Sequence, residues 1–360
     1  MSQPSFLFSS SPHVHGGDSV PKVMRTVIWA LMPATAFSVF TFGWPALLVI
    51  LITILSCVVA EHVVQKMRQR ASTLDDQSAA LTGLLLALTL PPYSPWWVCV
   101  VGGVFAIVVA KQLYGGLGYN MFNPALIARV FLLISFPVEL TSWPAVNPLL
   151  GEHSYTLSQA IIIIFGGGPA ALGMNLDALT AATPLGQYRM QVGLGKSVEE
   201  ALGGAYAFNY QDAATGLIGG SLGETSALLL ALGGGYLLYR RLITWHIPVS
   251  MILGCVVPAA IMQIIDSGHY PGPIFHLLTG GLLIGAFFMA TDMVTSPVTK
   301  NGQLIFGAGC GLLTYIIRTW GGYPEGVSFA VVLMNCTVPL IDEYTRPAVY
   351  GKPKDKKAKA

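Results

Sequence analysis

The chain has 360 residues, of which 53% are hydrophobic and only 10% are charged, and its mean hydropathy is +0.63. Soluble domains carry about 25% charged residues, so the composition excludes an ordinary soluble enzyme and indicates a membrane protein with several spans. The formal net charge is only +2, and the basic residues form no dense cluster outside the C-terminal tail. We therefore expect no nucleic-acid partner.

The first 21 residues are polar and contain no apolar core of the kind that a cleavable signal peptide requires. We interpret 1–21 as a cytoplasmic N-terminal segment. Beyond it lie about ten continuously apolar segments, a pattern that favours membrane-spanning helices over the alternating strands of a membrane barrel. Some are short, which indicates broken or tilted helices. The predicted fold class is an all-α polytopic membrane protein with about ten transmembrane helices, near 22–42, 44–63, 78–92, 95–114, 122–138, 226–241, 246–265, 276–292, 302–320 and 326–345.

Basic residues in the short connections predict the orientation of the chain in the membrane. With the N-terminus in the cytoplasm, only Arg318 falls outside in a short connection. We therefore expect a multi-pass protein of the bacterial inner membrane with both termini in the cytoplasm. The basic tail, 346–360, would then contact anionic membrane lipid. The residues expected inside are the five lysines after 350 together with Lys22, Arg25, Lys66, Arg68, Arg70, Lys111, Arg129, Arg240, Arg241, Lys300 and Arg346.

A long extracytoplasmic loop, 141–225, divides the spans into two repeats at 22–140 and 226–345. An odd number of spans in each half forces the halves into opposite orientations, which predicts two inverted five-helix repeats. A short internal echo supports this interpretation. Leu-Thr-Gly opens the third span and also the eighth, and Lys111 and Arg318 each precede a Gly-Gly pair at the end of the following span.

The five cysteines all lie inside apolar segments, and no two are close enough to form a CxxC pair. Iron–sulfur clusters and structural zinc need clustered thiolates. We expect no metal site in this chain and interpret the cysteines as packing residues. They are Cys57, Cys99, Cys255, Cys310 and Cys336.

A polar segment in the long loop, DALTAATPLG, begins at Asp177 and contains Thr180 and Thr183. Asp177 is suited to cap a short helical turn. Pro184 restricts the backbone of Thr183 to an extended conformation, and we expect its hydroxyl to point away from any helix. The small residues before Thr183 leave room for a bulky group beside that hydroxyl. Taken alone, the segment also fits an ordinary polar turn.

Two further motifs interrupt the spans. Asn120 and Asn123-Pro124 follow a Gly-rich stretch at the start of the fifth span. There a helix N-terminus would favour an electron-rich ligand, although a tight turn between helices would use the same residues. Asp292 ends the eighth span, where an ionisable side chain indicates either a functional site in the membrane or an interfacial helix cap. Both alternatives stay open, and Glu325 is a weaker candidate of the same kind.

Five blocks in one order resemble the RnfD family, which supplies a membrane subunit of the Rnf complexes, the ion-translocating ferredoxin:NAD oxidoreductases of bacterial membranes. This family is related to the NqrB subunits of the sodium-translocating NADH:quinone reductases. The resemblance runs from about residue 10 to residue 345 and is carried by SPHVHGGDSV, GGLGYNMFNPA, DALTAATPLG, MATDMVTSP and GGYPEGVSFAVVLMN.

The resemblance implies covalent FMN. In the family, the last Thr of an [ST]-x-A-T motif carries FMN through a phosphoester that a flavin transferase forms outside the cytoplasm. Thr183 matches that residue, with Thr180 and Asp177 as its motif context. Ala181 departs mildly from the Gly or Ser common at its position but leaves the acceptor intact. A second, non-covalent riboflavin is also implied.

The implied function is electron transfer between ferredoxin and NAD pathways, coupled to Na⁺ or H⁺ translocation, as one subunit of a translocase together with other membrane and iron–sulfur subunits. No catalytic residue is assigned, and Asn120, Asn123 and Asp292 are candidates for an ion or flavin pathway. Two alternatives stay open: a small-solute channel or transporter of the inverted-repeat type, and the NqrB subunit of a sodium-translocating NADH:quinone reductase.

Overall fold

A computed structural model describes residues 19–347 of the chain, except 71, 152–153, 167, 169–170, 172–182, 204–207, 225 and 324. Within these residues the chain is helical and contains no β-strand, so the predicted all-α class is confirmed. The first part, as far as η2, comprises α1 (Val20–Phe42), α2 (Trp44–Met67), η1 (Leu74–Asp76), α3 (Ser78–Leu88), α4 (Trp96–Val104) and the π-helical η2 (Phe105–Gln112).

The remaining helices follow in chain order. Between the two predicted repeats lie only short helices, whereas the second repeat again contains long ones. They are α5 (Pro124–Ser135), α6 (Pro137–Thr141), α7 (Leu157–Phe165), α9 (Pro184–Gly193), α10 (Val198–Gly203), α11 (Tyr210–Thr215), η4 (Leu222–Glu224), α12 (Ala227–Tyr239), α13 (His246–Ile265), α14 (Pro273–Leu278), α15 (Leu282–Ile284), the π-helical η5 (Gly285–Met289), α16 (Lys300–Trp320) and α17 (Val327–Thr345).

Each of the predicted apolar segments contains a helix, but the helices differ in length. Among the described residues, four helices are long and apolar enough to cross a membrane, namely α1, α2, α13 and α17. Helices α3, α5 and α12 are shorter apolar helices, and α4 continues directly into η2. The membrane character is therefore supported, whereas the number of ten complete spans stays a prediction.

The expectation of broken helices is confirmed most clearly at the eighth apolar segment. Helix α14 ends at Leu278, and α15 begins only at Leu282 after a break that contains Gly280 in the left-handed region (φ 67°). The chain then continues as the π-helix η5. Such π-helical turns are frequent at functional sites, and backbone carbonyls in a break need partners from elsewhere in the protein.

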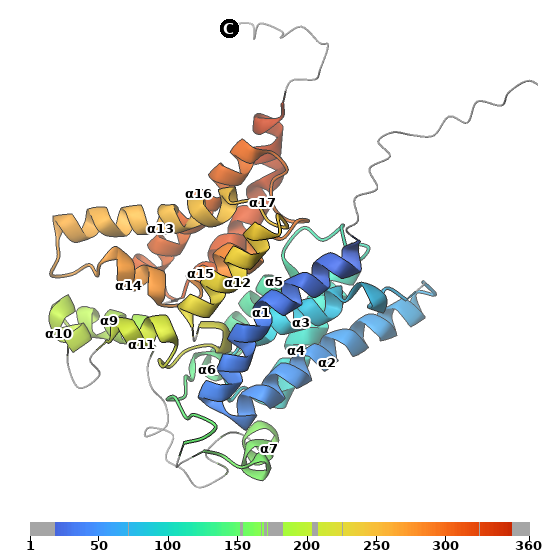
Figure 1. Cartoon of the computed structure of the whole chain (residues 1–360), viewed down its shortest axis with the longest axis horizontal. Helices are drawn as coiled ribbons and strands as arrows, with labels where there is room; N and C mark the ends of the chain where they lie inside the picture. The colour runs from blue at the N-terminus through green and yellow to red at the C-terminus, as the bar shows by residue number, and fades with distance from the viewer. Residues whose placement is uncertain are drawn as a thin grey trace, which may run out of the picture.

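Figure 1 shows the helices in two groups, with α1 to α5 in blue to cyan and α12 to α17 in yellow to red. Helices α1 and α12, the first of each predicted repeat, pack against each other. Helix α7 of the predicted loop lies at the bottom of the view, α9 to α11 lie at the left, and α17 ends at the top. Helix α7 and the C-terminal end of α17 thus lie at opposite ends of the view.

Helices α13 and α16 approach closely because glycines line their contact. A Cβ atom added to Gly311 would lie 2.1 Å from the carbonyl oxygen of Met251, and one added to Gly254 would lie 2.5 Å from the carbonyl oxygen of Ala308. Small residues allow this kind of backbone approach in membrane proteins. Large apolar side chains, by contrast, point outward, as at Ile264, which is 85% exposed. An outer surface of this kind suits lipid.

Three of the basic residues used to predict the orientation are buried in the structure. We expected Lys111 and Arg129 on the cytoplasmic side and Arg318 in an extracytoplasmic connection, but their exposed fractions are only 2%, 1% and 2%, so none of them lies in an exposed connection. Each lies within a helical segment and has hydrogen-bond partners inside the protein, so none of them indicates on which side of the membrane a loop lies. Orientation therefore stays a prediction based on the remaining basic residues. Those that are described and exposed are Lys22, Arg25, Lys66, Arg68, Arg70, Arg240, Arg241, Lys300 and Arg346.

Candidate functional site

Thr183 is the N-cap of helix α9. Its backbone is extended (φ −59°, ψ 153°), as Pro184 at the first helical position predicts. The hydroxyl oxygen accepts a hydrogen bond from the backbone N–H of Gly186 at 3.1 Å. The expectation that this hydroxyl points away from any helix is therefore wrong, because the extended conformation is also the one in which a Thr oxygen caps a helix. Asp177 and Thr180 lie outside the described residues.

A partly open cavity with about 690 Å³ of empty space surrounds Thr183, although Thr183 itself is only 4% exposed. About 250 Å³ of it can hold the centre of a water-sized sphere, slightly less than the 300–1,000 Å³ that is typical of small-molecule sites. The cavity brings together segments far apart in the sequence. Its lining consists of Arg129, Leu133, Leu140, Thr141, Trp143, Thr183, Gly186, Tyr323 and Glu325.

Arg129, from α5, is the cationic group of this cavity, which we call the Thr183 cavity. One of its terminal nitrogens, Nη2, lies 3.1 Å from Oε2 of Glu325, and its guanidinium carbon lies 5.9 Å from the centre of the Trp143 ring. The other nitrogen, Nη1, is buried and has no hydrogen-bond partner among the described residues. A buried, unsatisfied guanidinium N–H is costly, so this nitrogen is available to an anionic ligand.

The donors in the Thr183 cavity suit a phosphate ester. The α9 N-terminus adds backbone N–H groups and a positive helix dipole to the charge of Arg129. Guanidinium groups bind phosphate oxygens in short, charge-assisted hydrogen bonds. The aromatic side chains of Trp143 and Tyr323 offer flat apolar surfaces on which a ring could pack. The residues present therefore fit a phosphorylated aromatic group attached to Thr183.

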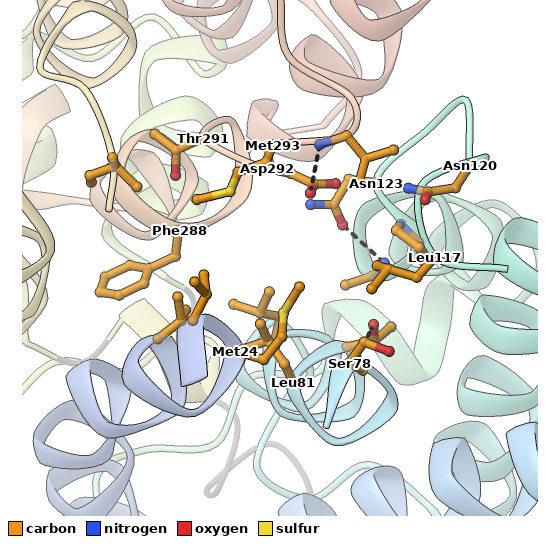
Figure 2. A pocket seen from close by; sticks show the side chains of 18 of the residues that line it. Met24, Ser78, Leu81, Leu117, Asn120, Asn123, Phe288, Thr291, Asp292 and Met293 are labelled. Carbon is orange, nitrogen blue, oxygen red and sulfur yellow. Dashed lines mark hydrogen bonds between the residues drawn. The ribbon is translucent and has the colours of Figure 1, made fainter. Parts of the chain in front are cut away.

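A second cavity, shown in Figure 2, contains all three of the other predicted residues, Asn120, Asn123 and Asp292. It has about 860 Å³ of empty space, part of it open to the surroundings. We call it the Asn120 cavity. Its walls are mostly apolar and come from both predicted repeats, including Met24, Leu81, Leu85, Leu117, Phe287 and Phe288.

Asn123 links the two predicted repeats. Its Oδ1 atom caps α5 by accepting from the backbone N–H groups of Ala125 (3.0 Å) and Leu126 (3.3 Å), as the Asn-Pro motif predicts. Its Nδ2 atom donates to the carbonyl oxygen of Met289 at 3.1 Å, the last residue of η5. In this arrangement Asn123 uses its hydrogen-bonding groups to hold the protein together, and the sequence alone did not indicate the link to η5.

Asn120 is the better candidate for direct contact with a ligand. It is buried, and its Nδ2 atom donates to the carbonyl oxygen of Phe122 at 3.1 Å. Its Oδ1 atom is buried without a hydrogen-bond partner in the described part of the chain. An amide oxygen left unsatisfied in an apolar cavity offers an acceptor to an N–H or O–H group of a ligand.

Asp292 forms a cap, which is one of the two roles that the sequence left open. Its carboxylate accepts from the backbone N–H of Val294 (3.3 Å) and from the hydroxyl of Thr295 (3.1 Å), so it caps the turn that follows η5. It also lines the Asn120 cavity. The cap is therefore established by geometry, whereas a part in an ion or flavin pathway stays a prediction.

A buried ion pair borders the Asn120 cavity. Lys111 Nζ lies 2.9 Å and 3.0 Å from the two carboxylate oxygens of Glu61 and 2.5 Å from the hydroxyl of Ser78, and both Lys111 and Ser78 line the cavity. The Glu61 Oε1 atom also accepts from Gln112 (2.9 Å), Thr73 (3.1 Å) and Gln65 (3.2 Å). The ammonium group thus lies at the cavity wall with its charge neutralised by Glu61.

The two cavities have no lining residue in common, but helix α5 contributes to both. Asn123 begins this helix, and Arg129 lies six residues later, about 9 Å along the helix axis. Sequence analysis did not identify Arg129 or the Lys111–Glu61 pair as site residues. The available signal was a charged side chain within an apolar segment, which is rare in membrane helices unless it is paired or functional.

Comparison with known proteins places these features in a family. The sequence profile of the NQR2, RnfD, RnfE family matches residues 7–351. The chain is 48% identical over 335 residues to a protein of Stutzerimonas stutzeri that is named as the D subunit of an ion-translocating oxidoreductase complex, a match that covers 93% of each chain. It is 45% identical over 348 residues to the protein of that name from Halorhodospira halophila, with 95% of each covered. A relative of the same name from Escherichia coli O6:K15:H31 is 43% identical over 359 residues, which is 96% of this chain and 98% of the relative. The chain therefore belongs to the NQR2, RnfD, RnfE family.

Proposed function

We propose that this chain is the RnfD-type subunit of an ion-translocating oxidoreductase complex and that it carries FMN on Thr183. Relatives that match almost its whole length are named as that subunit, which supports an electron-transfer subunit of a translocase. The implied partners are the other membrane and iron–sulfur subunits of the complex and a flavin transferase. The chain would lie in the bacterial inner membrane with both termini in the cytoplasm.

The observation that carries the flavin proposal is the pairing of Thr183 with Arg129 in one cavity. The hydroxyl supplies the attachment point, and the unpartnered Nη1 of Arg129 supplies a donor for the phosphate. The N–H groups at the start of α9 add further positive potential. Trp143 and Tyr323 would hold the ring system and exclude water from it. The flavin itself supplies the redox chemistry, because it accepts and donates one or two electrons.

The Asn120 cavity is the proposed site of the non-covalent riboflavin. Its apolar walls suit the face of a flavin ring, and the free Oδ1 of Asn120 is an acceptor for the ring's N–H group. The ammonium group of Lys111 lines the cavity while Glu61 neutralises its charge, so the wall offers an N–H donor. Asp292 remains a candidate for ion coupling. Unchanged ion pumping by Asp292→Asn in the complex would remove it from that route.

The attachment of FMN to Thr183 is tested on the full chain produced in a bacterium that contains the flavin transferase. On a denaturing gel under ultraviolet light, the wild-type band is expected to fluoresce and the Thr183→Asn band is expected to be dark. Asn retains the ability to cap α9 but cannot form a phosphoester, so loss of fluorescence does not reflect loss of the cap.

The matched control is Thr141→Ala, because Thr141 lines the same cavity while its hydroxyl donates to the carbonyl oxygen of Pro137. This variant is expected to fluoresce like the wild type. A fluorescent Thr183→Asn band would show that the flavin is attached elsewhere. A dark wild-type band would contradict the flavin proposal and favour a channel, which carries no chromophore.

A further inference from the structure

Four buried or nearly buried charged side chains meet beside the Thr183 cavity. Two are arginines, Arg129 from α5 and Arg318 from the last turn of α16, and two are carboxylates, Glu224 from η4 and Glu325 from the segment before α17. Arg129 and Arg318 are 1% and 2% exposed, whereas Glu224 is 9% and Glu325 17% exposed. The two charges of each sign balance only if both carboxylates are ionised.

Arg318 is held by backbone carbonyl groups. Its Nη1 and Nη2 atoms donate to the carbonyl oxygens of His276 (2.7 Å) and Thr279 (3.0 Å) in and after α14, and its Nε atom donates to the carbonyl oxygen of Glu325 (3.1 Å). These bonds provide hydrogen-bond donors to carbonyl oxygens at the break in the eighth apolar segment. They also fix the guanidinium in place, so Arg318 provides a constant positive charge near the cluster.

Arg129 and Glu325 are only partly satisfied by each other. Their salt bridge uses Nη2 of the arginine and Oε2 of the glutamate. The other two atoms, Nη1 of Arg129 and Oε1 of Glu325, are buried and have no partner in the described part of the chain. Both side chains line the Thr183 cavity. A new anion in the cavity would therefore share Arg129 with Glu325.

Glu224 is the carboxylate of this cluster without an ion partner, since it forms no salt bridge within the described residues. Its carboxylate lies close to two glycines, with its oxygens 3.2 Å and 3.5 Å from the positions that Cβ atoms of Gly220 and Gly281 would take. Burial is the main cause that raises the pKa of Glu224, and the charge of Glu325 raises it further. The Ser221 hydroxyl, Arg129 and Arg318 act in the opposite direction.

We propose that Glu224 binds and releases a proton as the negative charge in the Thr183 cavity rises and falls. This inference rests on the proposed function, because the changing charge comes from electrons that neighbouring subunits deliver to the flavin. At a pH near 8, where the raised pKa leaves Glu224 partly ionised, a proton from the aqueous phase adds to its carboxylate oxygen when an electron enters and forms a neutral carboxylic acid. When the electron leaves, the O–H bond breaks and the proton returns to water.

The physical reason is charge balance in a poorly solvated environment. An added negative charge beside Arg129 removes part of the positive potential that favours ionised Glu224, and Coulomb interactions are strong where water is excluded. Glu325 retains its salt bridge to Arg129, whereas Glu224 has no such bond to lose. Protonation of Glu224 therefore restores the net charge of the cluster with the least rearrangement.

The test uses the assembled complex and infrared difference spectra of the reduced minus the oxidised state. The wild type is expected to show a band of a protonated carboxyl group that shifts in D₂O. Glu224→Gln, which mimics the neutral acid, is expected to lack this band. The pH dependence of the midpoint potential of the covalent flavin is expected to be weaker in this variant. The matched control is Glu200→Gln on the surface of α10, which is expected to retain both properties.

The outcomes separate the two proposals. A wild-type band on the denaturing gel without flavin fluorescence overturns the proposed function and this inference with it. A fluorescent complex in which Glu224→Gln keeps the carboxyl band and the full pH dependence overturns this inference alone. If Glu224→Gln assembles poorly, Glu224→Asp keeps a carboxyl group. A band that is displaced in frequency in this variant supports the proposal, and an unchanged band contradicts it.

Discussion

Removal of Glu61 is expected to destabilise the protein because it leaves a buried ammonium group without its counter-ion. Lys111 and Glu61 are 2% and 0% exposed and form a salt bridge of 2.9 Å. Breaking a buried pair of this kind costs roughly 3–5 kcal/mol of the free energy of unfolding. In Glu61→Leu, Lys111 would keep its hydrogen bond to the hydroxyl of Ser78 but lose both bonds to the carboxylate, so we expect a loss in that range.

The double variant Glu61→Leu/Lys111→Met separates the cost of an unpaired charge from the value of the pair. Replacing both members of a buried ion pair by apolar side chains of similar size is often close to neutral. Gln112, Gln65 and Thr73 also lose an acceptor, and each such bond contributes about 1 kcal/mol. The double variant is therefore expected to lie within about 3 kcal/mol of the wild type and to be no less stable than Glu61→Leu.

The assay is unfolding of the full chain in mixed micelles by titration with SDS, followed by tryptophan fluorescence. Exposed Glu343 provides the matched control, and Glu343→Leu is expected to change the free energy of unfolding by no more than about 0.5 kcal/mol. If the loss in the double variant equals the sum of the losses in Glu61→Leu and in Lys111→Met, the side chains do not interact energetically. That result would refute the reasoning from the buried pair.

Three further predictions concern the two cavities and Glu224 in the charged cluster. Arg129→Lys retains the charge but not the fork of donors, so less covalent flavin per mole of chain is expected on the denaturing gel, and wild-type yield would argue against a phosphate contact. Asn120→Leu removes the free acceptor of its cavity and is expected to lower the riboflavin extracted from the denatured chain, with covalent flavin unchanged, whereas an undiminished riboflavin content would exclude this contact. In the flavin-free Thr183→Asn background, the raised pKa of Glu224 predicts that the thermal midpoint falls as the pH rises from the unfolded pKa of about 4.5 toward the folded pKa. The reason is that ionisation of this carboxyl is opposed only in the folded state. Adding Glu224→Gln is expected to flatten this fall, and an unchanged slope would contradict the prediction.

The sequence predicted the features that depend on local chemistry. Continuous apolar runs located the helices, because a span must be apolar along most of its length. Asn123 before Pro124 and Thr183 before Pro184 marked the starts of α5 and α9, because an extended residue with a polar side chain followed by proline is suited to begin a helix. The Thr183 hydroxyl was nevertheless assigned the wrong direction, since the same conformation serves capping.

The contacts that the sequence did not predict join distant segments. Arg129 and Glu325 are 196 positions apart, and Glu61 and Lys111 are 50 apart. No local spacing connects such residues, and the rule that places basic residues in cytoplasmic loops counted Lys111 and Arg129 as loop residues. A charged side chain inside an apolar segment does not mark a loop when the fold supplies it with a buried partner. The break between α14 and α15 likewise became interpretable only with Arg318 seated in it.

The most direct test of the account is the mass of the peptide that contains Thr183, measured on the chain isolated from a host with its flavin transferase. The account predicts a peptide heavier by one FMN less one water, with the fragment ions assigning the added mass to Thr183. An unmodified peptide in that host, or the same added mass on Thr180, would contradict the assignment of Thr183 as the flavin carrier.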